Sequence, residues 1–128
     1  MVSSAGRPRV TRRMPAEVAE LVKARSGDRC EFGIEGCWGT AGESHHRITR
    51  KAGGRHRAAR AGSDRCSNLI RGCHACHQVV TDNPKWAYTQ GWCLREWQEP
   101  SQEPVLYRGQ LMYLDDAGDT HDFEEVGA

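Results

Sequence analysis

The chain has 128 residues, a formal net charge of +1, and 38% hydrophobic residues. A chain of this length forms one small domain, whose limited apolar core needs help from a metal or a partner. No apolar stretch is long enough to span a bilayer, and no apolar segment typical of a signal peptide follows Met1, so we expect a cytoplasmic protein without a membrane partner.

Charge is distributed unevenly along the chain. Residues 1–60 contain 13 Lys or Arg against 6 Asp or Glu, whereas residues 61–128 contain 5 against 11. A charge run alone more often marks a solvated loop. The acid-free stretch from Ser44 to Ser63 adjoins two histidines, however, which favours a phosphate-binding segment, because cations that neutralise phosphates release counterions. The candidate DNA contacts are Arg47, Arg50, Lys51, Arg55, Arg57 and Arg60.

In chain order, the first predicted element is a flexible basic arm over residues 1–13. A helix follows from Pro15 to Ser26, because proline suits the first helical position and Gly27 provides a stop. Residues 30–42 are rich in glycine and read as a ligand-bearing loop. A short strand is predicted over residues 45–48, before a loop containing the pair Gly53 and Gly54.

The second half of the chain is predicted to be helical first and then extended. One helix begins near His77, and a second follows Asn83 and Pro84 and ends at Gly91, with a kink between them. Two short strands, residues 105–107 and 111–114, form a C-terminal β-hairpin. The remainder, residues 115–128, reads as a solvated acidic tail.

Two cysteine pairs predict a structural zinc site. Cys30 and Cys37 are separated by six residues and Cys73 and Cys76 by two, and four thiolates complete a closed tetrahedral site. Disulfides are the main alternative, but nothing indicates export to an oxidising compartment. The segment from Cys73 to His77 also reads C-x-x-C-H, a haem attachment pattern that likewise requires export. The remaining cysteines, Cys66 and Cys93, are expected to be ordinary reduced thiols.

The histidines predict chemistry on a phosphodiester. Hydrolysis needs a base to deprotonate water and a cation to stabilise charge on phosphate. Adjacent residues of a strand point to opposite faces, so His45 and His46 can divide the work, one binding metal and the other facing the phosphate. His77 supplies a second ligand from a rigid helix, with His74 off the site, and Asn68 can hold the His46 loop through backbone hydrogen bonds. Singly, each residue is more often structural.

In this combination the chain resembles the HNH endonuclease family, specifically its small zinc-stapled members from bacteriophages and mobile elements. The resemblance covers about residues 14–92. It rests on Cys30, Cys37, His45-His46-Arg47, Gly53-Gly54, Ser67-Asn68-Leu69 and Cys73-His74-Ala75-Cys76-His77. It implies an α+β, ββα-metal domain with flanking helices, in which an antiparallel hairpin carries His46 and Asn68 and a helix carries His77. The strand pattern that follows adds a β extension over residues 93–114.

The resemblance also implies roles for individual residues. His46 is the general base, oriented by Asn68, while His45 and His77 bind a catalytic divalent ion, namely Mg²⁺, Mn²⁺, Ni²⁺ or Zn²⁺. Many relatives have Asp in place of His45, and Glu43 is an alternative ligand. The implied function is a metal-dependent DNA endonuclease, and a phage terminase is a candidate partner. A zinc-stapled nucleic-acid-binding module without catalysis is the alternative function.

Overall fold

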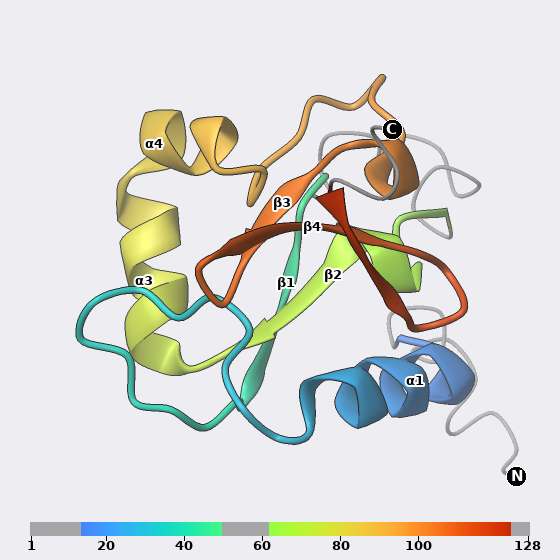
Figure 1. The fold of residues 1–128 in the computed structure, drawn as a ribbon, viewed down its shortest axis with the longest axis horizontal. Helices are drawn as coiled ribbons and strands as arrows, with labels where there is room; N and C mark the ends of the chain where they lie inside the picture. Colours follow the sequence, from blue (N-terminus) through green and yellow to red (C-terminus); the bar gives the residue numbers. More distant parts are fainter. Residues whose placement is uncertain (1–13, 50–61, 124–128) are drawn as a thin grey trace, which may run out of the picture.

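The computed structural model describes residues 14–49 and 62–123. In chain order its elements are α1 (Ala16–Ser26), β1 (Glu43–His46), the 3-10 turn η3 (Cys66–Asn68), β2 (Leu69–Gly72), α3 (His74–Asp82), α4 (Pro84–Thr89), the 3-10 turn η4 (Pro100–Gln102), β3 (Val105–Tyr107), β4 (Gln110–Leu114) and β5 (Thr120–Asp122). The protein is a small mixed α+β domain, as its sequence predicts (Figure 1).

A two-stranded hairpin runs through the middle of the molecule, and the helix after it lies to one side (Figure 1). β1 and β2 are antiparallel, with His46 opposite Leu69 and Glu43 opposite Gly72. α3 follows β2 directly and contacts β1. β1 begins two residues before the predicted strand, and Asn68 lies in η3, at the entrance of β2 rather than within it.

The first helix agrees with its prediction, and the next two agree in part. α1 ends at Gly27, whose φ of 62° suits glycine, and packs against β2 and η3. α3 begins at His74, one turn earlier than predicted, with Cys73 as its N-cap. Asn83 separates α3 from α4 as expected, but its amide donates to the carbonyl oxygen of Val79 at 2.8 Å and does not cap α4.

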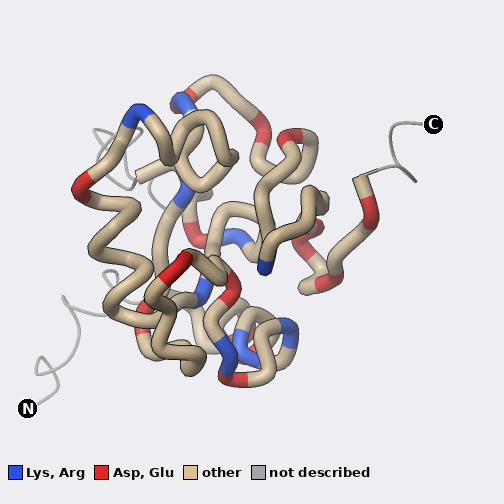
Figure 2. Tube along the Cα trace, turned by 60° about the vertical axis from the view of Figure 1, so that its left-hand side comes forward, with Lys and Arg blue, Asp and Glu red and all other residues tan. Residues whose placement is uncertain are grey.

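The C-terminal strands form a three-stranded antiparallel sheet in the order β3-β4-β5. β3 and β4 are the predicted hairpin. Within the predicted solvated tail, Thr120–Asp122 form a strand that was not predicted, β5, which pairs with β4 although His121 and Asp122 are exposed. The turn between β4 and β5 is held by the Asp115 carboxylate, which accepts from the backbone N–H of Ala117 and of Asp119, each at 2.9 Å. Acidic residues of this hairpin are visible in Figure 2.

One hydrophobic core joins the hairpin, α3 and the C-terminal sheet. It contains Cys30, Phe32, Ile70, Cys73, Cys76, Val80, Ala87, Trp92, Val105, Tyr107 and Leu114. The predicted β extension over residues 93–114 contributes Val105, Tyr107 and Leu114 to this core. Among the described residues, no helix combines the length and apolar character needed to cross a bilayer.

Candidate functional site

The four predicted cysteine ligands meet in one cluster. The Sγ atoms of Cys30, Cys37, Cys73 and Cys76 all lie within 4.8 Å of one another. Cys30 and Cys37 come from the loop after α1, whereas Cys73 and Cys76 come from the junction of β2 with α3. This arrangement could hold a metal ion and would fasten that loop to the start of α3.

Backbone N–H groups point at the cysteine sulfurs, as expected around thiolates. The Sγ of Cys73 accepts from the N–H of Cys76 at 3.3 Å and of Trp38 at 3.4 Å. Burial disfavours ionisation of this thiol, but these N–H donors outweigh it and lower the pKa of Cys73 to about 6. The Sγ of Cys30 accepts from the N–H of Cys73 at 3.3 Å. The sulfurs are thus oriented for a cation.

All six cysteines are free thiols. Cys66 is buried against Val22 of α1, and Cys93 is half-buried and packs against the main core, so both match the expected ordinary thiols. Cys73 and Cys76 belong to the four-cysteine cluster. That arrangement fits neither a disulfide framework nor the haem alternative as well as it fits a metal site.

His45 and His77 lie face to edge between β1 and α3, with ring centroids 5.2 Å apart. The Nε2 of His45 is 2.6 Å from the carbonyl oxygen of Trp92. Because a carbonyl oxygen only accepts, this Nε2 carries the proton and Nδ1 keeps its lone pair. Burial lowers the pKa of His45 to about 4, so the ring is neutral at pH 7 and can act as a ligand.

Glu43 links His77 to a histidine that was predicted to lie off the site. Its carboxylate is 2.6 Å from Nδ1 of His77 and 2.7 Å from Nδ1 of His74. These two contacts lower the pKa of Glu43, which is therefore ionised and accepts a hydrogen bond from each ring. His77 then has Nε2 free of this contact, the orientation that metal-binding histidines adopt beside a carboxylate. This arrangement could have been predicted from the sequence, because side chains alternate between the two faces of a strand and Glu43 lies two residues before His45, on the same face of β1.

His46 points to the other face of β1, as predicted. Its Nε2 is 2.8 Å from the Oδ1 of Asp64. Asn68 is 1% exposed and holds the segment after His46, because its Oδ1 accepts from the N–H of Ile48 at 2.8 Å and its Nδ2 donates to the Ile48 carbonyl at 3.1 Å. The expected hydrogen bonds of Asn68 are present. Asp64 was not anticipated from the sequence.

Arg47 was predicted to contact phosphate, and this is wrong. Its side chain is fully buried, and its guanidinium donates to backbone carbonyl oxygens at Gly91, Ser67, Pro100, Glu103 and Pro104. A guanidinium engaged in this way is not available to DNA. The other candidate contacts, Arg50, Lys51, Arg55, Arg57 and Arg60, lie outside the described residues, as do Gly53 and Gly54.

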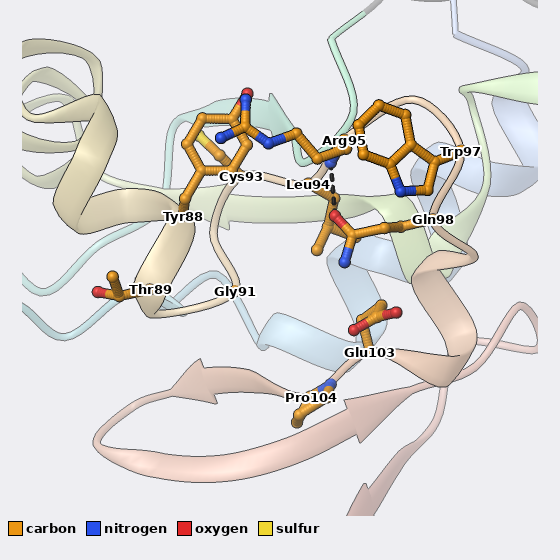
Figure 3. Close-up of a pocket in the computed structure, with 10 residues that line it drawn as sticks. All are labelled: Tyr88, Thr89, Gly91, Cys93, Leu94, Arg95, Trp97, Gln98, Glu103 and Pro104. Atoms are coloured by element: carbon orange, nitrogen blue, oxygen red, sulfur yellow. Dashed lines mark hydrogen bonds between the residues drawn. The ribbon is translucent and has the colours of Figure 1, made fainter.

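A separate pocket lies between α4 and η4, with a volume of about 420 Å³. Figure 3 shows the guanidinium of Arg95 over the ring of Tyr88, 3.8 Å from its centroid, and the backbone N–H of Arg95 bonded to Gln98. The predicted site residues do not line this pocket. The cysteine cluster and the histidines of β1 and α3 are therefore the stronger candidate site.

Comparison with known proteins gives no assignment. No family model matches the chain, and no curated protein or solved structure is significantly similar to it. In the part of the chain that the structure describes, the four cysteines are the one group of three or more His, Cys, Asp or Glu ligand atoms gathered closely enough to hold a metal.

Proposed function

We propose that this protein is a metal-dependent endonuclease that hydrolyses phosphodiester bonds in DNA. The main support is the division of labour between two adjacent residues of β1. His45 faces His77 of α3, with ring centroids 5.2 Å apart, whereas His46 lies 2.8 Å from Asp64 on the other face. One face thus offers nitrogen ligands for a cation, and the other offers a base with a buried carboxylate behind it.

Two metals have different roles in this proposal. The four cysteines bind a structural Zn²⁺, since four thiolates suit tetrahedral zinc and leave no open coordination position. Nδ1 of His45 and Nε2 of His77 bind an exchangeable divalent ion, with Mg²⁺, Mn²⁺, Ni²⁺ and Zn²⁺ as candidates. That ion would stabilise the charge that develops on the scissile phosphate.

The general base is His46. Its Nδ1 takes a proton from water, and the resulting hydroxide attacks phosphorus to leave 5′-phosphate and 3′-hydroxyl ends. Asn68 positions the base through its two hydrogen bonds to the backbone of Ile48. DNA is the proposed partner, contacted by the basic residues between 50 and 60, and a phage terminase and the host cytoplasm remain proposals from the resemblance alone.

Plasmid cleavage tests this function. Supercoiled plasmid is incubated with the purified protein and each of the four metals, and nicked and linear products are measured. His46→Ala is expected to lower the rate by about 10² to 10⁴, since it removes the base. Zinc content, fold and DNA affinity should persist. His121→Ala is the matched control, because His121 lies in β5 and pairs with Asp115.

His77→Ala should also abolish DNA cleavage, but for a different reason. It removes a ligand of the exchangeable ion, so raising the metal concentration should restore part of the activity, which it should not do for His46→Ala. A His46→Ala protein that cuts at the parent rate would contradict the assigned base. A parent protein that binds DNA but cuts with none of the four metals would instead favour the zinc-stapled binding module.

A further inference from the structure

We propose that Asp64 is a positioning residue for His46, an inference that rests on the proposed function. The Oδ1 of Asp64 lies 2.8 Å from Nε2 of His46, and the two side chains are 6% and 18% exposed. The contact therefore joins a nearly buried carboxylate to the proposed base. Burying a carboxylate is costly unless it is paired, so its position beside an imidazole is a specific feature of the fold.

Asn68 fixes both partners of this contact at once. Its side chain binds the backbone of Ile48, two residues after His46, as described above. Its Nδ2 also donates to the carbonyl oxygen of Ser63 at 2.9 Å, and Ser63 immediately precedes Asp64. A single buried amide thus holds the segment carrying the imidazole and the segment carrying the carboxylate at a set separation. The pair is preorganised by the hairpin and does not depend on DNA.

The geometry gives Asp64 a defined task. A carboxylate oxygen accepts a hydrogen bond from Nε2–H, which leaves the lone pair on Nδ1 and makes Nδ1 the basic atom. Nδ1 then takes a proton from water, hydroxide forms a bond to phosphorus, the bond to the leaving 3′ oxygen breaks, and that oxygen takes up a proton from solvent. Asp64 stabilises the imidazolium formed in this step through the same hydrogen bond.

The other histidine–carboxylate contacts provide a contrast. Glu43 is 36% exposed beside His74 and His77, and Asp115 is 33% exposed beside His121. Such solvated contacts contribute little and form readily on a surface. Among the histidine–carboxylate contacts of residues 14–49 and 62–123, the Asp64 contact is the one in which water is largely excluded from the carboxylate.

Nuclear magnetic resonance of the His46 ring nitrogens tests the contact without requiring activity. In the parent protein Nε2 should carry the proton. Asp64→Ala should remove this preference and give a mixture of tautomers, whereas Asp64→Asn keeps an acceptor oxygen but removes the charge. Asp28→Asn, a change at an exposed carboxylate, should leave the His46 signals unchanged. An unchanged tautomer in Asp64→Ala would overturn the proposal.

Kinetics then test the catalytic consequence. Asp64→Asn should lower kcat by about 10-fold or more, within the loss of about 10² to 10⁴ expected for the base itself, with KM unchanged. Because Asp64 acts through His46, its replacement should cost nothing further in a His46→Ala background. If the parent is active and Asp64→Asn leaves its kcat unchanged, the positioning role alone is overturned. The same holds if Asp64→Asn lowers kcat equally in the parent and in the His46→Ala variant. A parent without cleavage overturns the proposed function and this role together.

Discussion

At the scale of single residues, Arg47 shows how a basic side chain can serve the fold. The sequence places it directly after the two histidines, within an acid-free run, where it suggests a phosphate contact. In the structure its guanidinium instead ties the end of β1 to η3, to the end of α4 and to the segment from η4 to β3. Burial lowers its pKa to about 10, so it remains charged at neutral pH.

Arg47→Lys separates a structural role from a role in binding DNA. Lysine keeps the positive charge but cannot satisfy several carbonyl oxygens in a fixed fork. We expect the free energy of unfolding to fall by about 2–4 kcal/mol, since each buried acceptor left unsatisfied costs about 1–3 kcal/mol. Denaturant unfolding measures this loss. Unchanged stability with weaker DNA binding would instead restore the phosphate contact.

The site residues also show which contacts can be predicted from the sequence and which cannot. The cysteines and Asn68 were predictable because their partners are backbone groups or each other, and spacing is enough to suggest this. Asp64 was not predictable, because it lies 18 residues from His46 along the chain. Their contact depends on where the folded chain places η3, the turn that follows Asp64. The burial of Arg47 is likewise a property of the packed molecule, because its acceptors lie 20 to 57 residues away.

At the scale of elements, the predicted boundaries were accurate where one residue imposes a boundary by itself. Gly27 ends α1, and Pro84 begins α4. The ends of β1 were displaced because a short strand is defined by its partner, and register is not visible in one strand alone. β5 was missed because its acidic residues resemble a solvated tail, although the turn after Asp115 contains Gly118 with a φ of 92°.

Gly91, just after α4, has no room for a side chain. It has a φ of 81°, and a Cβ there would lie 2.2 Å from the carbonyl oxygen of Pro104 and 2.8 Å from the Cα of Val105. Gly91→Ala should therefore lower the free energy of unfolding by about 2–5 kcal/mol, from backbone strain together with overpacking. Denaturant unfolding measures the loss.

Gly109→Ala is the control for this prediction. Gly109 has a similar φ of 87°, but a Cβ there would meet nothing within 4 Å. Its substitution should cost only the strain, about 1–3 kcal/mol. Equal losses in the two variants would show that the close approach of α4 to β3 does not matter.

At the scale of the whole molecule, the N-terminal and C-terminal parts are joined by a buried polar contact as well as by the core. Glu31 is fully buried and accepts from Arg25 at 2.8 Å and from the hydroxyl of Tyr107 at 2.7 Å. It also accepts from the backbone N–H of Arg71 at 2.8 Å. One carboxylate thus connects α1, β2 and β3, and it fastens the C-terminal sheet to the N-terminal part of the chain.

We expect removal of the proposed structural metal to unfold the entire domain, because three of its four ligands lie in the hydrophobic core and the fourth packs against it. Binding of zinc to four thiolates contributes about 10–16 kcal/mol, as much as the usual total stability of about 5–15 kcal/mol. We expect Cys73→Ser and Cys30→Ser to lose bound zinc and cooperative thermal unfolding, and chelation of the parent to have the same effect. Cys93→Ser, a change at a half-buried thiol outside the cluster, should keep both. Retained zinc and melting temperature in both ligand variants would refute the site.

The position of Cys73 has a consequence for the order of assembly. This residue is at once a member of the four-cysteine cluster and the N-cap of α3, the helix that presents His77 to His45. Under the proposed function, zinc would bind before the second ion, because it would fix Cys73 at the start of α3 and so hold His77 beside His45. A newly synthesised chain would then be expected to cleave DNA only after it acquires zinc, whatever the supply of the other cation.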